Sequence, residues 1–222
     1  MENAVRHTGP MTVFSPSKRL RAPQQRAELT KLRLLDAATK AFARQGFGST
    51  PALALEKAAK VKRGLLVYHF GSKERLWRAV IDRLAARVTA SLERVVYGDG
   101  GRTDPVELMV RGFILANSET PEFLRIMVIE SRRGVSLIDY TIDIYVRRFI
   151  AGVEVLTGRQ MTVHDYYALL GSCSFFFMSP REAIHIWGVD PASAEFLDGH
   201  TKVVAQMLRA RWAAADPKTN DS

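Results

Sequence analysis

The sequence predicts an all-α protein, on the strength of its helix-start signals and the spacing of its apolar residues. Apolar residues recur every three or four positions over most of the chain, and no alternating stretch bounded by turn residues indicates a strand. Between residues 50 and 191, five prolines directly follow a residue whose side chain can cap a helix: Thr50-Pro51, Asp104-Pro105, Thr120-Pro121, Ser179-Pro180 and Asp190-Pro191. We therefore expect helices packed on helices.

The expected helices can be placed in order. The first should end at Gly46, since glycine commonly follows the last turn of a helix. A long helix should run from Ser72 to the glycine-rich loop at residues 98–101. A capping box formed by Asp104 and Glu107 marks the next start. The expected helices cover 25–45, a short stretch after Thr50, 63–70, 72–97, 105–118, 121–133, 136–158, 163–178, 180–187 and 191–213.

The rest of the chain is organised around the stretch from Thr50 to Leu76. Two short helices are separated by a break at residues 60–62, and the second one is basic. Leu66 and Phe70 lie four positions apart, so they can form the face that packs on the domain. This arrangement is typical of a helix-turn-helix, whose second helix enters the major groove of DNA.

The outward side of that second helix carries the residues expected to contact DNA. Arg63 can pair bidentately with a guanine edge, whereas neighbouring donors can bind phosphates. Lys73 stands in the first turn of the next helix, where a cation opposes the helix dipole, and a phosphate bound at the helix N-terminus would explain it. The expected DNA-binding residues are Thr50, Lys62, Arg63, Gly64, Leu65, Tyr68, His69 and Lys73.

This region resembles the DNA-binding domain of TetR/AcrR-type transcription regulators over roughly residues 27–76. The matching motifs are Leu34-Leu35-Asp36-Ala37-Ala38, Phe42-Ala43-Arg44-Gln45-Gly46-Phe47, Tyr68-His69-Phe70 and Ser72-Lys73-Glu74, with Thr50, Leu55, Ala59, Val61 and Gly64 in register. The resemblance implies three DNA-binding helices followed by a helical bundle that dimerises and holds an effector. Lys60, Leu65 and Val67 depart from the pattern, so the operator sequence does not carry over.

The domain boundaries follow from these elements. We expect a flexible basic arm at 1–24, a helix-turn-helix domain at 25–71, a ligand-binding and dimerisation domain at 72–213, and a disordered tail at 214–222. The arm can reach the minor groove or phosphates, or it can be a disordered tail with incidental charge. The sequence leaves both interpretations open.

Charge is distributed very unevenly along the chain. The net charge is +9, yet residues 1–90 carry 18 basic and 6 acidic side chains, against 14 and 17 in residues 91–222. The positive charge therefore belongs to the N-terminal part, as expected of a nucleic-acid surface attached to a near-neutral body.

We expect the protein to be cytoplasmic. Cys173 is the only cysteine, which excludes an intrachain disulfide and favours a reducing compartment. The N-terminus lacks the apolar core of a signal peptide, and the most apolar window, residues 166–178, is too short to span a bilayer.

Two functional surfaces are expected in the second half of the chain. Apolar faces on the helices at 163–178 and 191–213 indicate a four-helix dimer interface, with burial inside the monomer as the alternative. Its expected residues are Tyr166, Leu170, Cys173, Phe177, Val203, Val204, Met207 and Leu208. The resemblance also implies an effector pocket, for which the candidates are Phe113, Asn117, Met127, Glu130, Arg148, Phe176 and Trp187.

The function predicted is a homodimeric transcription regulator that binds operator DNA and a small-molecule effector, with no cofactor. Family resemblance favours a repressor over an activator. A non-specific DNA-binding protein is the other class considered; it would explain the basic charge but not the large aromatic-rich body. Catalysis is not expected, because the chain carries no hydrolase, metalloprotease or phosphate-loop motif and no cluster with metal-ligand spacing.

Overall fold

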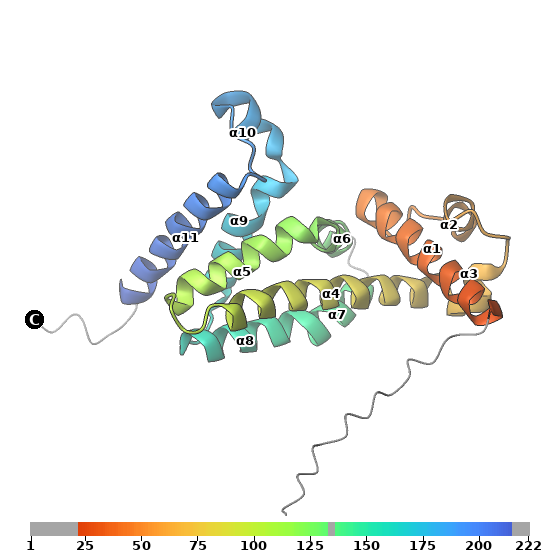
Figure 1. Ribbon diagram of the computed structural model, residues 1–222, viewed down its shortest axis with the longest axis horizontal. Helices are drawn as coiled ribbons and strands as arrows, with labels where there is room; N and C mark the ends of the chain where they lie inside the picture. The colour runs from red at the N-terminus through yellow and green to blue at the C-terminus, as the bar shows by residue number, and fades with distance from the viewer. Residues whose placement is uncertain (1–21, 133–135, 215–222) are drawn as a thin grey trace, which may run out of the picture.

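The computed structural model describes residues 22–132 and 136–214, and every regular element within them is helical (Figure 1). The all-α prediction is confirmed. The elements are α1 (Ala22–Gln45), α2 (Ala52–Ala58), α3 (Leu65–Phe70), α4 (Lys73–Gly98), α5 (Pro105–Glu119), α6 (Pro121–Ser131), α7 (Ser136–Thr141), the π-helix η1 (Ile142–Val146), α8 (Arg147–Thr157), α9 (Val163–Met178), α10 (Pro180–Trp187) and α11 (Ala194–Ala214). Most of the arm and tail expected at 1–24 and 214–222 lies outside the described residues.

Three helix starts differ from the expectation. The first helix begins at Ala22, so residues 22–24 belong to it rather than to an arm. The Thr50 hydroxyl does not cap α2; it donates to the Gly46 carbonyl oxygen at 2.7 Å. The last helix begins at Ala194 because residues 190–193 form a turn that precedes it, in which the Ser193 amide donates to the Asp190 carbonyl.

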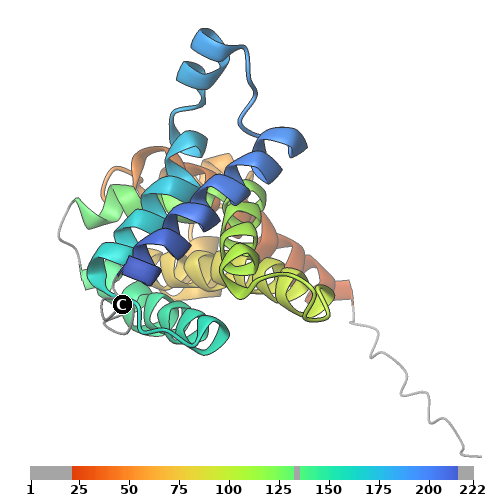
Figure 2. The same ribbon diagram turned by 90° about the vertical axis from the view of Figure 1, so that its left-hand side faces the viewer.

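The molecule consists of a small head and a larger body joined by α4. Helices α1–α3 form the head at one end of the long axis, and α4 runs from the head along α5 to the far end of the body (Figure 1). Helices α9 and α11 pack together across the body, and α10 projects beyond them (Figure 2). No helix among the described residues is long and apolar enough to cross a membrane.

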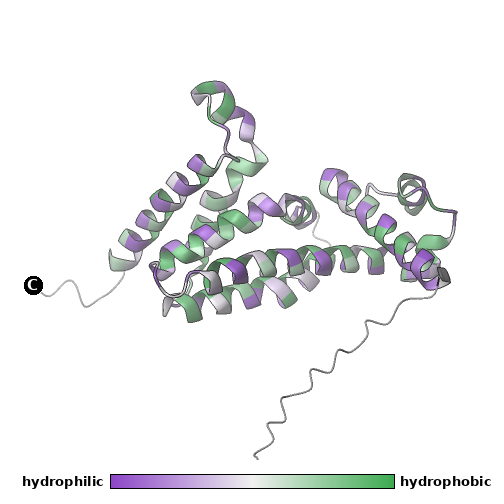
Figure 3. Cartoon of the chain, in the orientation of Figure 1, coloured by the Kyte–Doolittle hydropathy of each residue, from purple (hydrophilic) through white to green (hydrophobic). Residues whose placement is uncertain are grey.

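The head and the body share a hydrophobic core. Leu34, Phe42, Leu66 and Trp77, all fully buried, pack in one cluster with Ile126 from α6. A second cluster fills the space between α5, α8, α9 and α11, and apolar residues mark the facing sides of these helices in Figure 3. Because α6 belongs to the head cluster, a movement of α6 acts directly on the head.

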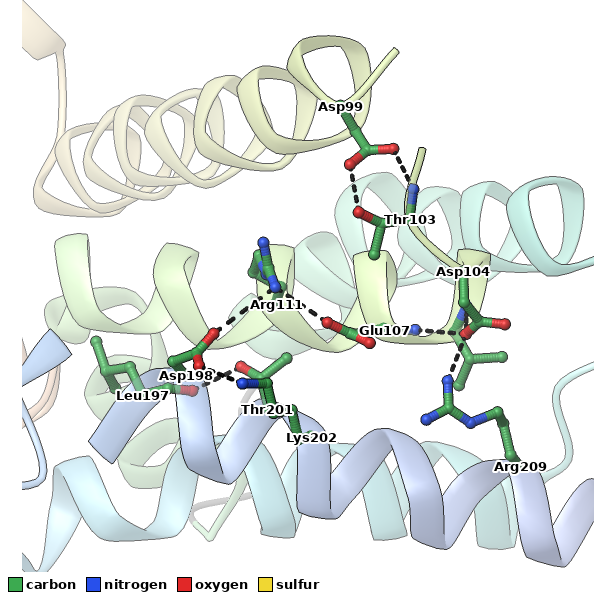
Figure 4. Close-up of polar contacts among 11 residues, drawn as sticks. Asp99, Thr103, Asp104, Glu107, Arg111, Leu197, Asp198, Thr201, Lys202 and Arg209 are labelled. Carbon is green, nitrogen blue, oxygen red and sulfur yellow. Dashed lines mark hydrogen bonds and ion pairs between the residues drawn. The ribbon is translucent and has the colours of Figure 1, made fainter. Parts of the chain in front are cut away.

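Polar contacts on the surface orient α11 against α5 (Figure 4). The Asp104 carboxylate accepts from the first amides of α5 and also from Arg209 on α11, at 2.9 Å. Arg111 on α5 lies between Glu107, at 3.0 Å, and Asp198, at 3.7 Å. These pairs are partly exposed, so they fix register more than they add stability.

Candidate nucleic-acid interface and ligand cavity

Helix α3 presents an apolar face to the head, as the sequence predicted, and exposes Val67 and Tyr68 to solvent. Leu66 is fully buried and Phe70 packs against the head core. On the other side Tyr68 is 79% exposed, and its ring meets the edge of the His69 ring at 4.9 Å. The exposed side chains of Lys62 and Arg63 have no hydrogen bond or ion pair within the described part of the chain, so both cations are available to an anionic partner.

A buried carboxylate that the sequence analysis missed holds the start of α3. Glu56 is 5% exposed, and its Oε1 accepts from the Gly64 amide at 2.8 Å and from the Leu66 amide at 3.0 Å. Amides at a helix N-terminus have no partner within the helix, and a negative charge there is favourable. The signal available in the sequence was the absence of a Ser, Thr, Asp or Asn cap before Leu65, which requires an acceptor from elsewhere.

Two residues with positive φ shape the turn between α2 and α3. Lys60 has φ 55°, so a lysine adopts the left-handed conformation at this position. Gly64 has φ 90°, and no atom lies within 4 Å of a Cβ built at that position. The backbone angle, not lack of space, is therefore what requires glycine at position 64 within this chain.

Thr50 and Lys73 have structural contacts that the sequence did not suggest. Lys73 Nζ donates to the carbonyl oxygens of Phe47 and Thr50, both at 3.0 Å, and lies 4.0 Å from the centre of the Phe47 ring. Burial lowers the pKa of Lys73, partly offset by the charge of Glu130. Thr50 is 1% exposed, so its side chain does not reach a phosphate. Both residues brace the loop between α1 and α2, in place of the free phosphate contact expected.

Glu130 belongs to the junction between head and body and not to a ligand pocket. It is fully buried on α6, and its Oε1 accepts from the Phe47 amide at 2.6 Å. The backbone of Phe47 is thus held from two sides: its amide donates to Glu130 of α6, and its carbonyl oxygen accepts from Lys73 of α4. The expectation that Glu130 lines the pocket is wrong, because its side chain points to the loop between α1 and α2.

The body contains a cavity of about 770 Å³, lined by residues of α4, α5, α6, α7, η1, α8 and α9. Four expected residues line it: Phe113, Asn117, Met127 and Arg148. The walls are mainly aliphatic and aromatic. Asn117 is 9% exposed and donates through Nδ2 to the Phe113 carbonyl. The Arg148 side chain has no hydrogen bond or ion pair within residues 22–132 and 136–214.

Two further pocket candidates lie elsewhere. Phe176 packs in an aromatic cluster with Phe177, Phe196 and His200, whose ring lies 4.9 Å from it. Trp187 is 70% exposed at the end of α10. Helical spacing alone did not separate residues on the cavity side of the bundle from residues on its outer side.

The expected dimer face divides into buried and exposed residues. Cys173, Val204 and Leu208 belong to the body core and are at most 3% exposed, so they do not meet a partner. Burial raises the pKa of the Cys173 thiol, which stays protonated and unreactive. Tyr166 and Leu170 line the cavity, and Phe177 is half-buried.

An apolar surface nevertheless remains on α9 and α11. Val203 and Met207 are 53% and 58% exposed, as expected for a dimer face. Three residues of α9 that were not predicted join them, namely Tyr167, Phe175 and Met178. We refer to these five residues as the α9–α11 face.

Comparison with known proteins gives the same picture of the head. The family model described as "Bacterial regulatory proteins, tetR family" matches residues 34–80, from the middle of α1 into α4. The head of this chain is therefore of the TetR type.

Curated relatives match about a third of this chain. The HTH-type transcriptional repressor Rv3405c of Mycobacterium tuberculosis is 35% identical over 82 residues, which are 37% of this chain and 43% of that protein. The HTH-type transcriptional regulator UidR of Escherichia coli K12 is 35% identical over 80 residues, which are 34% and 41% of the two chains. The chain thus matches less than half the length of these relatives.

Solved structures extend the likeness to the whole TetR-type fold. A Clostridium perfringens protein described as a fatty acid metabolism regulator aligns with a TM-score of 0.60 and 17% identity, over 78% of this chain and 97% of that one. A TetR-like transcriptional regulator from Rhodococcus sp. RHA1 aligns with a TM-score of 0.57 and 18% identity, over 83% and 96%. At this identity the likeness concerns the fold alone.

Proposed function

We propose that this chain is a homodimeric, sequence-specific DNA-binding transcription regulator, released from its operator by a small-molecule effector. One observation carries the proposal: an exposed basic segment, held by the buried Glu56 carboxylate, sits on a head that shares its core with a body containing a large cavity. The same chain thus carries a surface for DNA and a site for a ligand, and α6 packs against both the head and the cavity.

The DNA contacts divide between base reading and phosphate binding. Arg63, at the end of the turn, reads a guanine edge, and Lys62 and Tyr68 bind phosphates beside it. Gly64 and Leu65 start the helix that lies in the major groove, and His69 supports the ring of Tyr68. Lys73 contributes by holding the loop before α2 in place.

Dimerisation places two heads on one operator. Two copies meet through their α9–α11 faces, in which Val203 and Met207 are the residues that both sequence and exposure single out. Related by a two-fold axis, their α3 helices would have to lie about 34–36 Å apart, or a multiple of that, to meet major grooves on one side of the duplex.

The effector is a largely apolar molecule held in the cavity. Phe113 and Met127 contribute to its apolar walls, and Asn117 and Arg148 supply polar groups that fix its orientation. Two routes lead from the cavity to the head. Helix α6 carries Met127 on the cavity and Glu130 on the Phe47 amide. The cavity residue Tyr145 of η1 donates to Asp82 on α4 at 2.8 Å.

Repression is the favoured sign of regulation, because a Mycobacterium tuberculosis relative that is 35% identical over 82 residues is named a repressor. In one conformation of the body the two heads do not match the spacing of the operator. An effector that binds this conformation more tightly than the DNA-binding one shifts the equilibrium toward it and so lowers the affinity for the operator.

The test is a titration of fluorescent DNA from the region upstream of the gene, against a scrambled duplex, at several salt concentrations. A preference of about a thousandfold or more, with two subunits or a multiple per site, supports specific regulation. Equal and steeply salt-dependent binding to both duplexes, and to other segments of the neighbouring DNA, would instead establish the non-specific class.

A further inference from the structure

Helix α10 packs only lightly against the described part of its own chain, at α9. None of its eight residues is buried, and it projects away from the body between the ends of α9 and α11 (Figures 1 and 2). Ile184, Ile186 and Trp187 are 51%, 63% and 70% exposed. An isolated helix shorter than about 12–15 residues is marginal in water, because its few hydrogen bonds barely offset the cost of nucleation. A second surface is needed to hold α10 as a helix.

The apolar residues of α10 continue those of the α9–α11 face. Phe175 and Met178 occupy the last turn of α9, directly before α10 begins, and both are exposed. Exposed apolar surface that extends over three neighbouring helices marks an interaction site rather than scattered surface residues.

The chain order indicates which partner covers α10. Because α10 connects α9 to α11, a contact that brings the α9–α11 faces of two copies together places α10 of each copy at the edge of that contact, beside the partner subunit. Arg181 and Glu182, the fixed charges of α10, have opposite signs, so two α10 helices brought together carry no net fixed charge.

We propose that α10 is an arm that embraces a second copy of this chain, with Ile184, Ile186 and Trp187 buried against the partner subunit. This inference rests on the proposed homodimer through α9 and α11. It assigns Trp187 to an intersubunit contact in place of the ligand pocket.

Trp187 itself reports on the contact. Of the three tryptophans, Trp77 and Trp212 are 0% and 6% exposed, so only Trp187 is open to solvent in the isolated subunit. We expect its emission to shift to longer wavelength, and its quenching by acrylamide to rise severalfold, when the protein is diluted from dimer to monomer. Sedimentation velocity on the same samples gives the oligomeric state, and W187F should lose the concentration-dependent signal.

Substitutions separate the arm from the dimer itself. Changing Ile184 and Ile186 together to Ser should raise the dimer dissociation constant at least tenfold. The matched control V155S, at an 86% exposed position on α8, should leave the constant unchanged. M207D should abolish dimerisation through the α9–α11 face.

The outcomes are distinct. In one outcome M207D is monomeric, the Ile184/Ile186 variant dimerises as tightly as wild type, and Trp187 stays accessible in the dimer. This outcome overturns the proposed arm and leaves the proposed dimer standing. Shielding of Trp187 in monomeric M207D shows that α10 folds on its own chain, which also overturns the arm. Monomeric wild type at every concentration overturns both proposals.

Discussion

The contact between Glu56 and the start of α3 can be dissected with two substitutions. Oε1 accepts both hydrogen bonds, so Gln in this position keeps an acceptor for the Gly64 and Leu66 amides and removes only the charge. Ala removes both. Hydrogen bonds to charged groups contribute about 1.5–3 kcal/mol each, against about 0.5–1.5 kcal/mol for neutral ones.

These values set the expected magnitudes. For the two hydrogen bonds together, E56Q should lower the free energy of unfolding by about 2–3 kcal/mol, and E56A by about 3–6 kcal/mol, because Ala leaves both amides without this acceptor. Both variants should also weaken DNA binding in the same order, since α3 loses its fixed orientation when its first turn frays.

Two measurements check this reasoning. Thermal unfolding gives the stability order, and hydrogen exchange at the Gly64 and Leu66 amides locates the change. The expected result is faster exchange at these amides in E56A, with an intermediate rate in E56Q. An E56A protein with wild-type stability and wild-type exchange at both amides would refute the role assigned to the carboxylate.

Three further predictions follow from the same contacts. K60G should stabilise the protein by about 0.5–1 kcal/mol, because relief of a left-handed lysine exceeds the entropy cost of glycine; a lower melting temperature would contradict this. R63A should relax preference at one base pair by about 1–3 kcal/mol, whereas K62A should weaken binding to every sequence and reduce the salt slope by about one, so identical behaviour would disprove the division of roles. The pKa of Asp165 is lowered, since hydrogen bonds from Thr162 and Arg211 outweigh the opposing effect of burial. Its contribution to stability is therefore present above the unfolded pKa and is lost as pH falls below about 4; the acid limb of a stability–pH profile should flatten in D165N.

The sequence by itself determined the helical content, the order of the helices and the DNA-reading segment. These features depend on local signals: capping residues, the spacing of Leu66 and Phe70, and the block of positive charge in residues 1–90.

The tertiary structure alone decided which residues of each helix meet which neighbour. Helical spacing identifies an apolar stripe, but it does not say whether that stripe faces the core, the cavity or a partner. Cys173, Val204 and Leu208 were assigned to a partner and belong to the core, whereas Trp187 was assigned to a pocket and lies exposed.

The polar contacts of longest range were the least predictable from sequence. Glu130 reaches Phe47 across 83 positions, and Lys73 reaches it across 26. Such contacts form only when packed helices bring distant backbone groups within 3 Å, and no local pattern encodes that distance. For this protein, local chemistry determined the elements and the helix-turn-helix, and packing determined the cavity, the brace between head and body, and the apolar surface left exposed on α9 and α11.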